Sequence, residues 1–235
     1  MISRRTLLAA ALASTVASTV AACGSKHDLT SSGSLAVTPQ PTLPTATLPP
    51  GAKVPASLVM IGDSITVASR KTLEPILAAI GFSAVAINAE VNRRIEVGSG
   101  KNGPTPGIVV ADFVLASGKR PAVWVIALGT NDAGLYSTDA EYRDLIDKML
   151  ARVPPKAPLV WVDTYRRDQL KGAEQFNSVL RDAITHRGKA VMAEWSQQVI
   201  ASTGKILRID GVHPNAAGVL IFSDLVRNAV VTVLS

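Results

Sequence analysis

From Ala56 to the C-terminus, short apolar runs alternate with segments of helical length, and this alternation constrains the fold more than any other feature. The apolar runs are four to six residues long, as in strands buried on both faces of a parallel sheet. They cover Leu58–Ile61, Ala84–Ile87, Val123–Leu128, Leu159–Val162 and Ala190–Ala193. Predicted helices cover Ile65–Ile80, Ile108–Ser117, Ala140–Arg152, Gly172–Arg187 and Ala216–Val233. Parallel strands need right-handed crossovers, so the pattern predicts an α/β fold: a three-layer α/β/α sandwich around a five-stranded parallel sheet.

The first 22 residues have the pattern of an export signal. The positive Ser3-Arg4-Arg5 precedes an apolar stretch, Leu7–Val20, that is shorter than the ~20 residues needed to span a bilayer. The small residues before Cys23 (Val20-Ala21-Ala22) resemble a bacterial lipobox, which predicts a lipidated Cys23 as the new N-terminus and anchoring to the outer face of the cell membrane. Ordinary cleavage that leaves a free cysteine is the alternative. The paired arginines also fit a twin-arginine signal, so the export route stays open.

Residues 23–54 are rich in Ser, Thr, Pro and Gly, and we expect them to form an extended, solvated linker after the lipidated cysteine. The folded domain is predicted to cover 55–235. Because Cys23 is the only cysteine, an internal disulfide and a zinc ribbon are excluded.

The charge pattern argues against a nucleic-acid partner. The formal net charge is +6, and it falls to +4 without residues 1–22, which hold two arginines and no acidic residue. The basic residues are scattered rather than gathered in a patch with aromatic residues. The sequence has no glycine-rich phosphate loop, dinucleotide fingerprint or metal-ligand cluster, so we expect no cofactor and no metal.

Residues whose side chains could take part in catalysis follow the predicted strands, and ligands bind at this end of the strands in parallel α/β sheets. Gly62-Asp63-Ser64-Ile65-Thr66 follows the first strand and opens the first helix, so the Ser64 hydroxyl would lie at a helix N-terminus. The alternative is that Ser64 or Asp63 simply caps this helix. Thr66 replaces the second glycine of the G-x-S-x-G elbow, which weakens an α/β-hydrolase interpretation.

Two more segments complete the pattern. In Asp210-Gly211-Val212-His213-Pro214, the carboxylate can hold one imidazole nitrogen while the other accepts a hydroxyl proton. An aspartate turn before a helix is the alternative. In Gly129-Thr130-Asn131-Asp132, the Asn131 amide can donate to an oxyanion, or it can be a turn residue.

Together, these segments resemble the SGNH (GDSL) hydrolase superfamily over about Leu58 to Ser235. The resemblance implies a flavodoxin-like fold, with Ser64 as nucleophile, His213 as general base and Asp210 as the carboxylate that orients it. It also implies an oxyanion hole that includes the Ser64 backbone N–H and the Asn131 side chain.

The segment after the second predicted strand departs from the family pattern. The family places a glycine after the second strand as a backbone oxyanion donor, and Asn92 stands at that position here. Asparagine tolerates a positive φ and keeps its N–H, so Asn92 is the expected third donor. An alignment through Gly98 is the alternative.

This segment and Trp161–Arg166 are similar to the SGNH domains of peptidoglycan O-acetyltransferases. The resemblance makes Tyr165 and Arg166 candidate substrate contacts, and a solvated loop is the alternative. Arg93 and Arg94 are expected to be an exposed pair. Trp124 and Trp161 are expected in the core, and Trp195 at the start of a further helix.

The leading hypothesis is an exported, lipid-anchored serine esterase that forms an acyl-enzyme and acts, as a monomer, on O-acyl esters of envelope glycans or glycolipids. The first alternative is an O-acyltransferase that uses the same acyl-enzyme. The second is a catalytically silent SGNH domain that binds a glycan or a protein.

Overall fold

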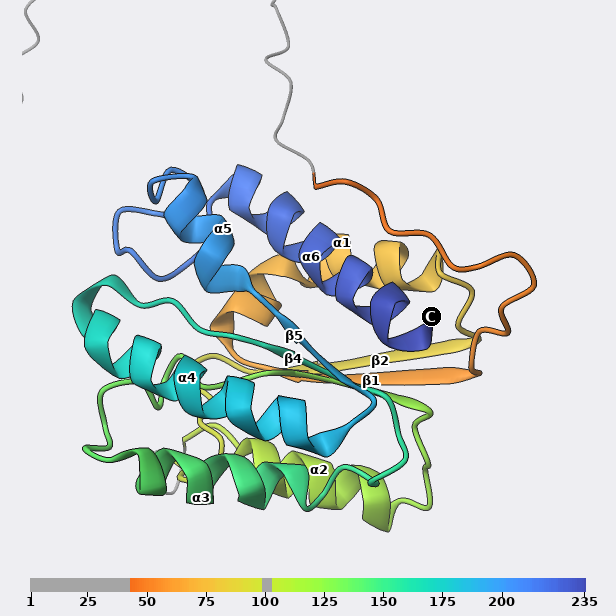
Figure 1. Cartoon of the computed structure of the whole chain (residues 1–235), viewed down its shortest axis with the longest axis horizontal. Coiled ribbons are helices and arrows are strands. Elements are labelled where there is room, and N and C mark those ends of the chain that lie inside the picture. Colours follow the sequence, from red (N-terminus) through yellow and green to blue (C-terminus); the bar gives the residue numbers. More distant parts are fainter. Residues whose placement is uncertain (1–42, 99–102) are drawn as a thin grey trace, which may run out of the picture. The chain divides into compact units, whose positions relative to one another are not determined.

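Five parallel strands form the sheet at the centre of the fold, in the order β2-β1-β3-β4-β5 (Figure 1). This is the flavodoxin-like order, and it confirms the predicted fold class. The computed structural model describes residues 43–98 and 103–235, all within one compact unit. The strands are β1 (Ser57–Gly62), β2 (Ala84–Ala89), β3 (Val123–Ala127), β4 (Leu159–Val162) and β5 (Ala190–Ala193).

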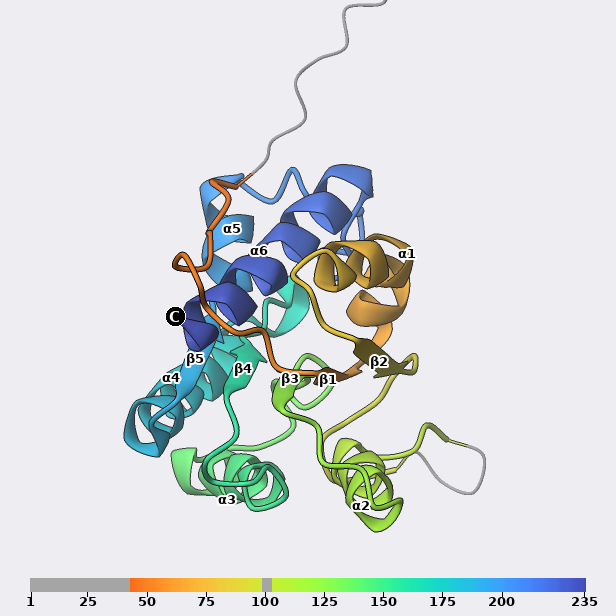
Figure 2. The ribbon, with the colours of Figure 1, turned by 90° about the vertical axis from the view of Figure 1, so that its right-hand side faces the viewer.

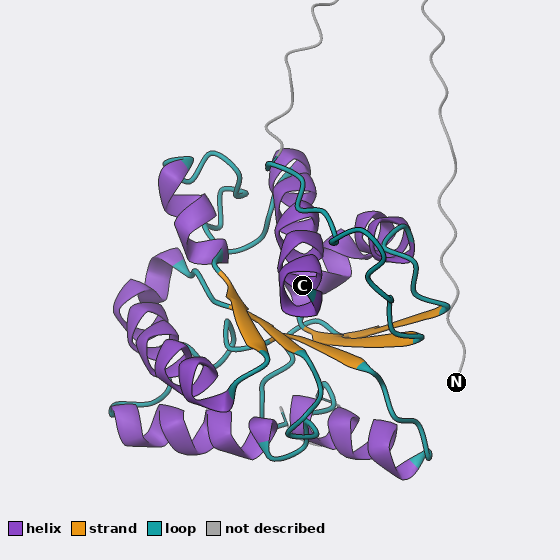
Figure 3. Cartoon of the chain, turned by 45° about the vertical axis from the view of Figure 1, so that its right-hand side comes forward, coloured by secondary structure: helices purple, strands orange, loops and turns teal. Residues whose placement is uncertain are grey.

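Helices cover both faces of the sheet, which gives the three predicted layers (Figures 2 and 3). One face carries α1 (Ser64–Ala78), α5 (Trp195–Ala201) and α6 (Ala216–Leu234). The other face carries α2 (Gly107–Ala116), α3 (Asp139–Leu150) and α4 (Leu170–Arg187), and a 3-10 turn, η1 (Arg167–Gln169), precedes α4.

Side-chain alternation along the strands divides the core into two layers. Leu58 and Met60 of β1 face the layer with α1 and α6, whereas Val59 and Ile61 face the layer with α2. Every residue of β3 is buried, because this strand has neighbours on both sides and helices on both faces. Full burial of one such aliphatic side chain stabilises a fold by about 1.5–3 kcal/mol. As predicted, Trp124 and Trp161 are buried, and Trp195 at the start of α5 is buried as well.

The expectation of full burial is wrong for the two edge strands. Residues of β2 alternate between exposed and half-buried, and most of β5 is only half-buried. The reason is geometric, because an edge strand has a neighbour on one side only. The small side chains of Ala84 and Ala86 are exposed, whereas Val85 and Ile87 pack against the α1–α6 layer.

Most predicted boundaries lie within two residues of the observed ones. Two strands, β4 and β5, match their predicted bounds. Helix α5 begins at Trp195 as expected, but its end at Ala201 was not predicted. By length and composition α6 is apolar enough to cross a membrane. Its buried face, which includes Phe222, Val226 and Val230, packs in the core.

The predicted signal (1–22) and Cys23 lie outside the described residues, as does most of the linker. The expectation of a solvated spacer is wrong for residues 43–46, which lie against α6, whereas residues 49–53 are exposed. The Ala46 backbone N–H donates to Asn228 Oδ1 (2.9 Å), and Asn228 Nδ2 donates to the Pro44 carbonyl (2.8 Å). Arg227 Nη1 donates to the Ala46 carbonyl (2.7 Å). A proline-rich segment forms no regular helix or sheet, but its free carbonyls still accept hydrogen bonds from side chains.

Candidate active site

The turn between β1 and α1 exposes the Ser64 hydroxyl to the other candidate residues. Only Asp63 separates the two elements, and its Oδ1 accepts a hydrogen bond from the Ile65 backbone N–H (2.9 Å), so Asp63 is the N-cap of α1. Ser64 Oγ lies 2.9 Å from His213 Nε2. The cap is therefore Asp63, and the Ser64 hydroxyl is left for the imidazole.

Two glycines allow tight packing beside this turn. A Cβ on Gly62 would overlap the Thr66 side chain. Gly129, two residues beyond the end of β3, has a φ of 125°, and a Cβ there would overlap Phe176 and Thr164. Substitution of either glycine would therefore displace the loops that carry Ser64 and Asn131.

Asp210 holds His213 from the opposite side. His213 Nδ1 lies 2.9 Å from Asp210 Oδ2, and Asp210 Oδ1 accepts the backbone N–H groups of Val212 (2.9 Å) and His213 (3.0 Å). Burial alone would raise the pKa of Asp210, but these N–H groups and the imidazole outweigh it and lower the pKa to about 2. An ionised Asp210 makes Nδ1 the donor nitrogen. Nε2 then accepts the Ser64 hydroxyl proton.

The loop between α5 and α6 is braced around His213. The Arg208 backbone N–H donates to the His213 carbonyl (2.8 Å), and Arg208 Nε donates to the Pro214 carbonyl (3.1 Å). Arg167 donates its backbone N–H to the Gly211 carbonyl (3.1 Å). These bonds fix the backbone at both sides of the imidazole.

In the loop between β2 and α2, Asn92 has a φ of 61°, in the left-handed region where the family has glycine. Gly98, the alternative, has no positive φ. Asn131 Nδ2 donates to the Arg93 carbonyl (3.0 Å), which ties the β3 loop to the residue directly after Asn92. The structure therefore places Asn92 and Asn131 in neighbouring, hydrogen-bonded loops.

Arg93 contradicts the expectation of an exposed arginine pair, because it is only 2% exposed. Its guanidinium donates to the carbonyls of Gly62 (3.1 Å), Asn88 (2.7 Å) and Thr105 (2.8 Å). It also donates to the side chains of Asn88 (2.9 Å) and Glu90 (3.0 Å). Burial lowers the pKa of Arg93, while Glu90 opposes this shift. Sequence reasoning missed this role because nothing local distinguishes a buried arginine from an exposed one.

Arg94 makes a second unexpected link. Its Nε lies 3.1 Å from Asp132 Oδ1, and Asp132 Oδ2 accepts the Ile95 backbone N–H (3.1 Å). Asp132 is fully buried, and burial raises its pKa to about 6, against the opposing effects of the Ile95 N–H and Arg94. The fourth residue of the Gly129–Asp132 segment therefore fastens the β2–α2 loop to the β3 loop.

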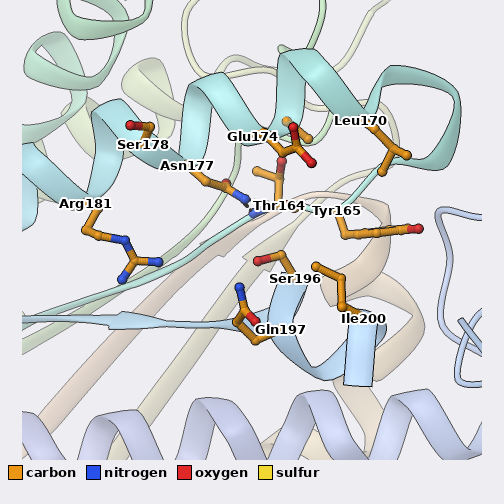
Figure 4. Close-up of a pocket in the computed structure, with 11 residues that line it drawn as sticks. Thr164, Tyr165, Leu170, Glu174, Asn177, Ser178, Arg181, Ser196, Gln197 and Ile200 are labelled. Atoms are coloured by element: carbon orange, nitrogen blue, oxygen red, sulfur yellow. Dashed lines mark hydrogen bonds between the residues drawn. The ribbon is translucent and has the colours of Figure 1, made fainter. Parts of the chain in front are cut away.

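The two candidate substrate contacts, Tyr165 and Arg166, lie in different environments. Arg166 pairs with Asp168 (2.9 Å), and its Nη1 lies 3.4 Å from the Thr130 carbonyl, beside Asn131. Tyr165 instead lines a cavity between α4 and α5 (Figure 4). Within residues 43–98 and 103–235, no group of three or more His, Cys, Asp or Glu side chains is placed to hold a metal ion.

The sequence model of the GDSL-like lipase/acylhydrolase family matches residues 60–220, well over half of the chain. The chain belongs to this family. It is a serine hydrolase of the esterase type, which confirms the SGNH (GDSL) expectation. A search of curated proteins found no match.

Several solved structures share the fold. The C-terminal catalytic domain of peptidoglycan O-acetyltransferase A (OatA) from Streptococcus pneumoniae is 20% identical, with a TM-score of 0.59 over 77% of this chain and 96% of that one. A lipase/acylhydrolase from Enterococcus faecalis is 18% identical, with a TM-score of 0.60 over 75% and 96%. Est24, a carbohydrate acetylesterase from Sinorhizobium meliloti, is 14% identical, with a TM-score of 0.56 over 76% and 97%.

The Arg93 contacts yield a prediction for Arg93→Lys. Lysine keeps the charge but has three donors on one nitrogen, so it cannot reproduce five separate hydrogen bonds. We expect the kcat for a short-chain ester to fall about 10- to 100-fold with KM changed less than about three-fold, because a shifted donor costs transition-state stabilisation. Steady-state kinetics on p-nitrophenyl acetate measure both constants.

Arg70→Lys is the matched control, because Arg70 also donates to a β2 carbonyl, that of Ile87 (2.8 Å), but is partly exposed, and its other polar partner in the described part of the chain is Glu74 on the same helix. We expect it to retain kcat within about two-fold, as usual for a surface change. Equal losses in the two variants would show that Arg93 acts only through general stability.

Proposed function

We propose that the protein is an exported, membrane-anchored serine esterase that removes O-acyl groups, chiefly O-acetyl, from glycans or glycolipids of the cell envelope. The observation that carries the proposal is the continuous hydrogen-bonded path from Asp210 through His213 to Ser64, with both distances at 2.9 Å. In this proposal Ser64 is the nucleophile, His213 the general base and Asp210 the orienting carboxylate.

In the acylation step, Ser64 Oγ attacks the ester carbonyl carbon and its proton passes to His213 Nε2. The imidazolium is stabilised by Asp210, whose pKa of about 2 keeps it ionised across the neutral range. The C–O bond to the alcohol then breaks, the alcohol oxygen takes the proton from Nε2, and Ser64 carries the acyl group.

The negative charge on the carbonyl oxygen needs donors already in place. The Ser64 backbone N–H lies in the first turn of α1, where N–H groups have no partner within the helix. Asn92 would add its backbone N–H, and Asn131 would add the second hydrogen of Nδ2, since the first is bonded to the Arg93 carbonyl. One such donor contributes about 3–4 kcal/mol to barrier lowering in other enzymes.

In the deacylation step, His213 takes a proton from water as the water attacks the acyl-Ser64 carbonyl. The bond to Ser64 Oγ breaks, Oγ regains a proton from Nε2, and the acid leaves. A glycan hydroxyl in place of water would make the enzyme an O-acyltransferase by the same steps. The fold shared with the OatA catalytic domain supports this second candidate.

The proposed substrate class rests on two observations. The fold is shared both with a carbohydrate acetylesterase and with a domain of a peptidoglycan O-acetyltransferase. The residues before Cys23 have the lipobox pattern, and an anchored enzyme meets esters of envelope polymers close to the membrane.

The nucleophile assignment predicts the behaviour of Ser64→Ala. On p-nitrophenyl esters of rising chain length, we expect the unaltered protein to prefer short acyl groups. We expect the kcat of the variant to be lower by about 10⁴-fold or more, since the covalent route is removed. A fluorophosphonate probe should label the unaltered protein and not the variant. Absence of labelling and turnover in a folded, unaltered sample would instead indicate a silent binding domain.

Product analysis separates the esterase from the transferase. With an activated acetyl ester and a glycan acceptor, we expect acetate to be the main product, because solvent competes for the acyl-enzyme at a partly exposed site. The side chain of His213 is 33% exposed. Mass spectrometry of the glycan gives the transferred fraction, and acetylated glycan in excess over acetate would favour the transferase.

The anchoring proposal predicts the fate of Cys23→Ser. Without the thiol there is no acceptor for the lipid, so we expect the variant to leave the membrane fraction. Cell fractionation with an immunoblot measures the distribution. Gly24→Ser is the neighbouring control, because it introduces the same side chain one position later and retains the thiol. Equal membrane association of Cys23→Ser and the unaltered protein would contradict lipid anchoring.

A further inference from the structure

A cavity of about 430 Å³ lies between α4 and α5 beyond the end of β4, and the proposed acylation and deacylation steps do not use it (Figure 4). Its size is within the range of small-ligand sites, about 300–1,000 Å³. Tyr165, Leu170 and Ile200 form an apolar end, whereas Ser178, Arg181 and Gln197 form a polar end. We call it the α4–α5 cavity.

The walls of the α4–α5 cavity are held by hydrogen bonds within the protein. Asn177 on α4 accepts the Thr164 backbone N–H at Oδ1 (2.9 Å) and donates Nδ2 to the Thr164 carbonyl (2.8 Å). At the start of α5, Ser196 donates its backbone N–H (2.7 Å) and its hydroxyl (2.5 Å) to the buried Asp163. Both helices are thus tied to the loop after β4, so the cavity is preformed.

Several polar groups in the cavity are free to meet a ligand. In the part of the chain that the structure describes, the side chains of Glu174, Ser178 and Gln197 make no hydrogen bond. The Thr164 hydroxyl is buried without a partner. The Glu174, Ser178 and Gln197 side chains are exposed, so hydroxyl groups of a ligand can reach them and exchange hydrogen bonds with them.

The charges disfavour an anionic ligand. Arg181 is already paired with Glu194 (2.6 Å), and Glu174 adds an unpaired carboxylate to the wall. An acyl chain fits poorly at the polar end, where it would leave these groups without partners. An uncharged ligand with many hydroxyls and one apolar face fits both ends, with that face on Tyr165 and Leu170. A saccharide ring has this chemistry.

The apolar end of the cavity adjoins the candidate active site through the chain. Tyr165 is followed by Arg166, which reaches the Thr130 carbonyl (3.4 Å) beside Asn131. The next residue, Arg167, donates its backbone N–H to Gly211 (3.1 Å) in the loop of Asp210 and His213. The loop after β4 therefore contributes both to the apolar end of the cavity and to the surroundings of Asn131 and His213.

We propose that the α4–α5 cavity is a subsite for an uncharged saccharide unit of the glycan whose ester is cleaved at Ser64. The assignment rests on the proposed esterase function and adds to it a site that selects the polymer rather than the acyl group.

The test fills the cavity with Ser178→Trp, at an exposed position of α4. The substrates are p-nitrophenyl acetate and an O-acetylated chito-oligosaccharide whose amino groups are all N-acetylated, so that it is uncharged. We expect kcat/KM on the oligosaccharide to fall at least ten-fold, mainly through KM. This loss should exceed the loss on p-nitrophenyl acetate at least five-fold. Thr185→Trp, two turns further along α4 and outside the lining, is the matched control and should change both values less than two-fold.

A binding measurement separates this proposal from the esterase assignment. In the Ser64→Ala background, calorimetry with the same N-acetylated chito-oligosaccharide, free of O-acetyl groups, should detect binding that Ser178→Trp weakens at least ten-fold. No binding, or equal losses on both substrates, would overturn the subsite. If Ser178→Trp instead removes a preference among p-nitrophenyl esters for longer acyl chains, the cavity holds the acyl group and the saccharide proposal is wrong. Turnover that survives Ser64→Ala would overturn the esterase mechanism instead.

Discussion

The contact between Ser64 and His213 is the interaction on which the candidate site depends, and the parallel sheet makes it possible. The two residues are 149 positions apart, yet Oγ and Nε2 lie within hydrogen-bond distance. Loops at the carboxyl ends of parallel strands meet at one edge, so the start and the end of the domain contribute to one site. Asp63 caps α1, which leaves the Ser64 hydroxyl available for this contact.

A second constraint acts on the loops around that contact. The β2–α2 loop has no regular secondary structure at Arg93. Instead, the Arg93 side chain holds the loop by donating to the carbonyls of Gly62, Asn88 and Thr105. Its own carbonyl holds Asn131, and Asn92 precedes it with a positive φ. A buried guanidinium is favourable only when its donors are satisfied, and here each contact also orders backbone. The loop geometry therefore depends on one side chain.

The fold and the candidate residues were predictable from the sequence to different degrees. Buried strands and amphipathic helices have periodic patterns, so all five strands and the long helices were found. Ser64 and Asn131 were identifiable because they stand shortly after β1 and β3, and His213 because it follows Asp210 by three residues just before the last helix. The burial of Arg93 was not, since it depends on carbonyls from three separate segments. The same holds for residues 43–46, whose partners on α6 lie more than 180 positions away.

The docking of residues 43–46 on α6 has a mechanical consequence for the proposed anchored form. A chain as long as the stretch from Cys23 to Leu43 reaches at most about 70 Å. A pull from the N-terminal side would first load the side chains of Asn228 and Arg227, and through them a helix of the core. Strand β1, which leads directly into Ser64, would be shielded from that force until those bonds had parted.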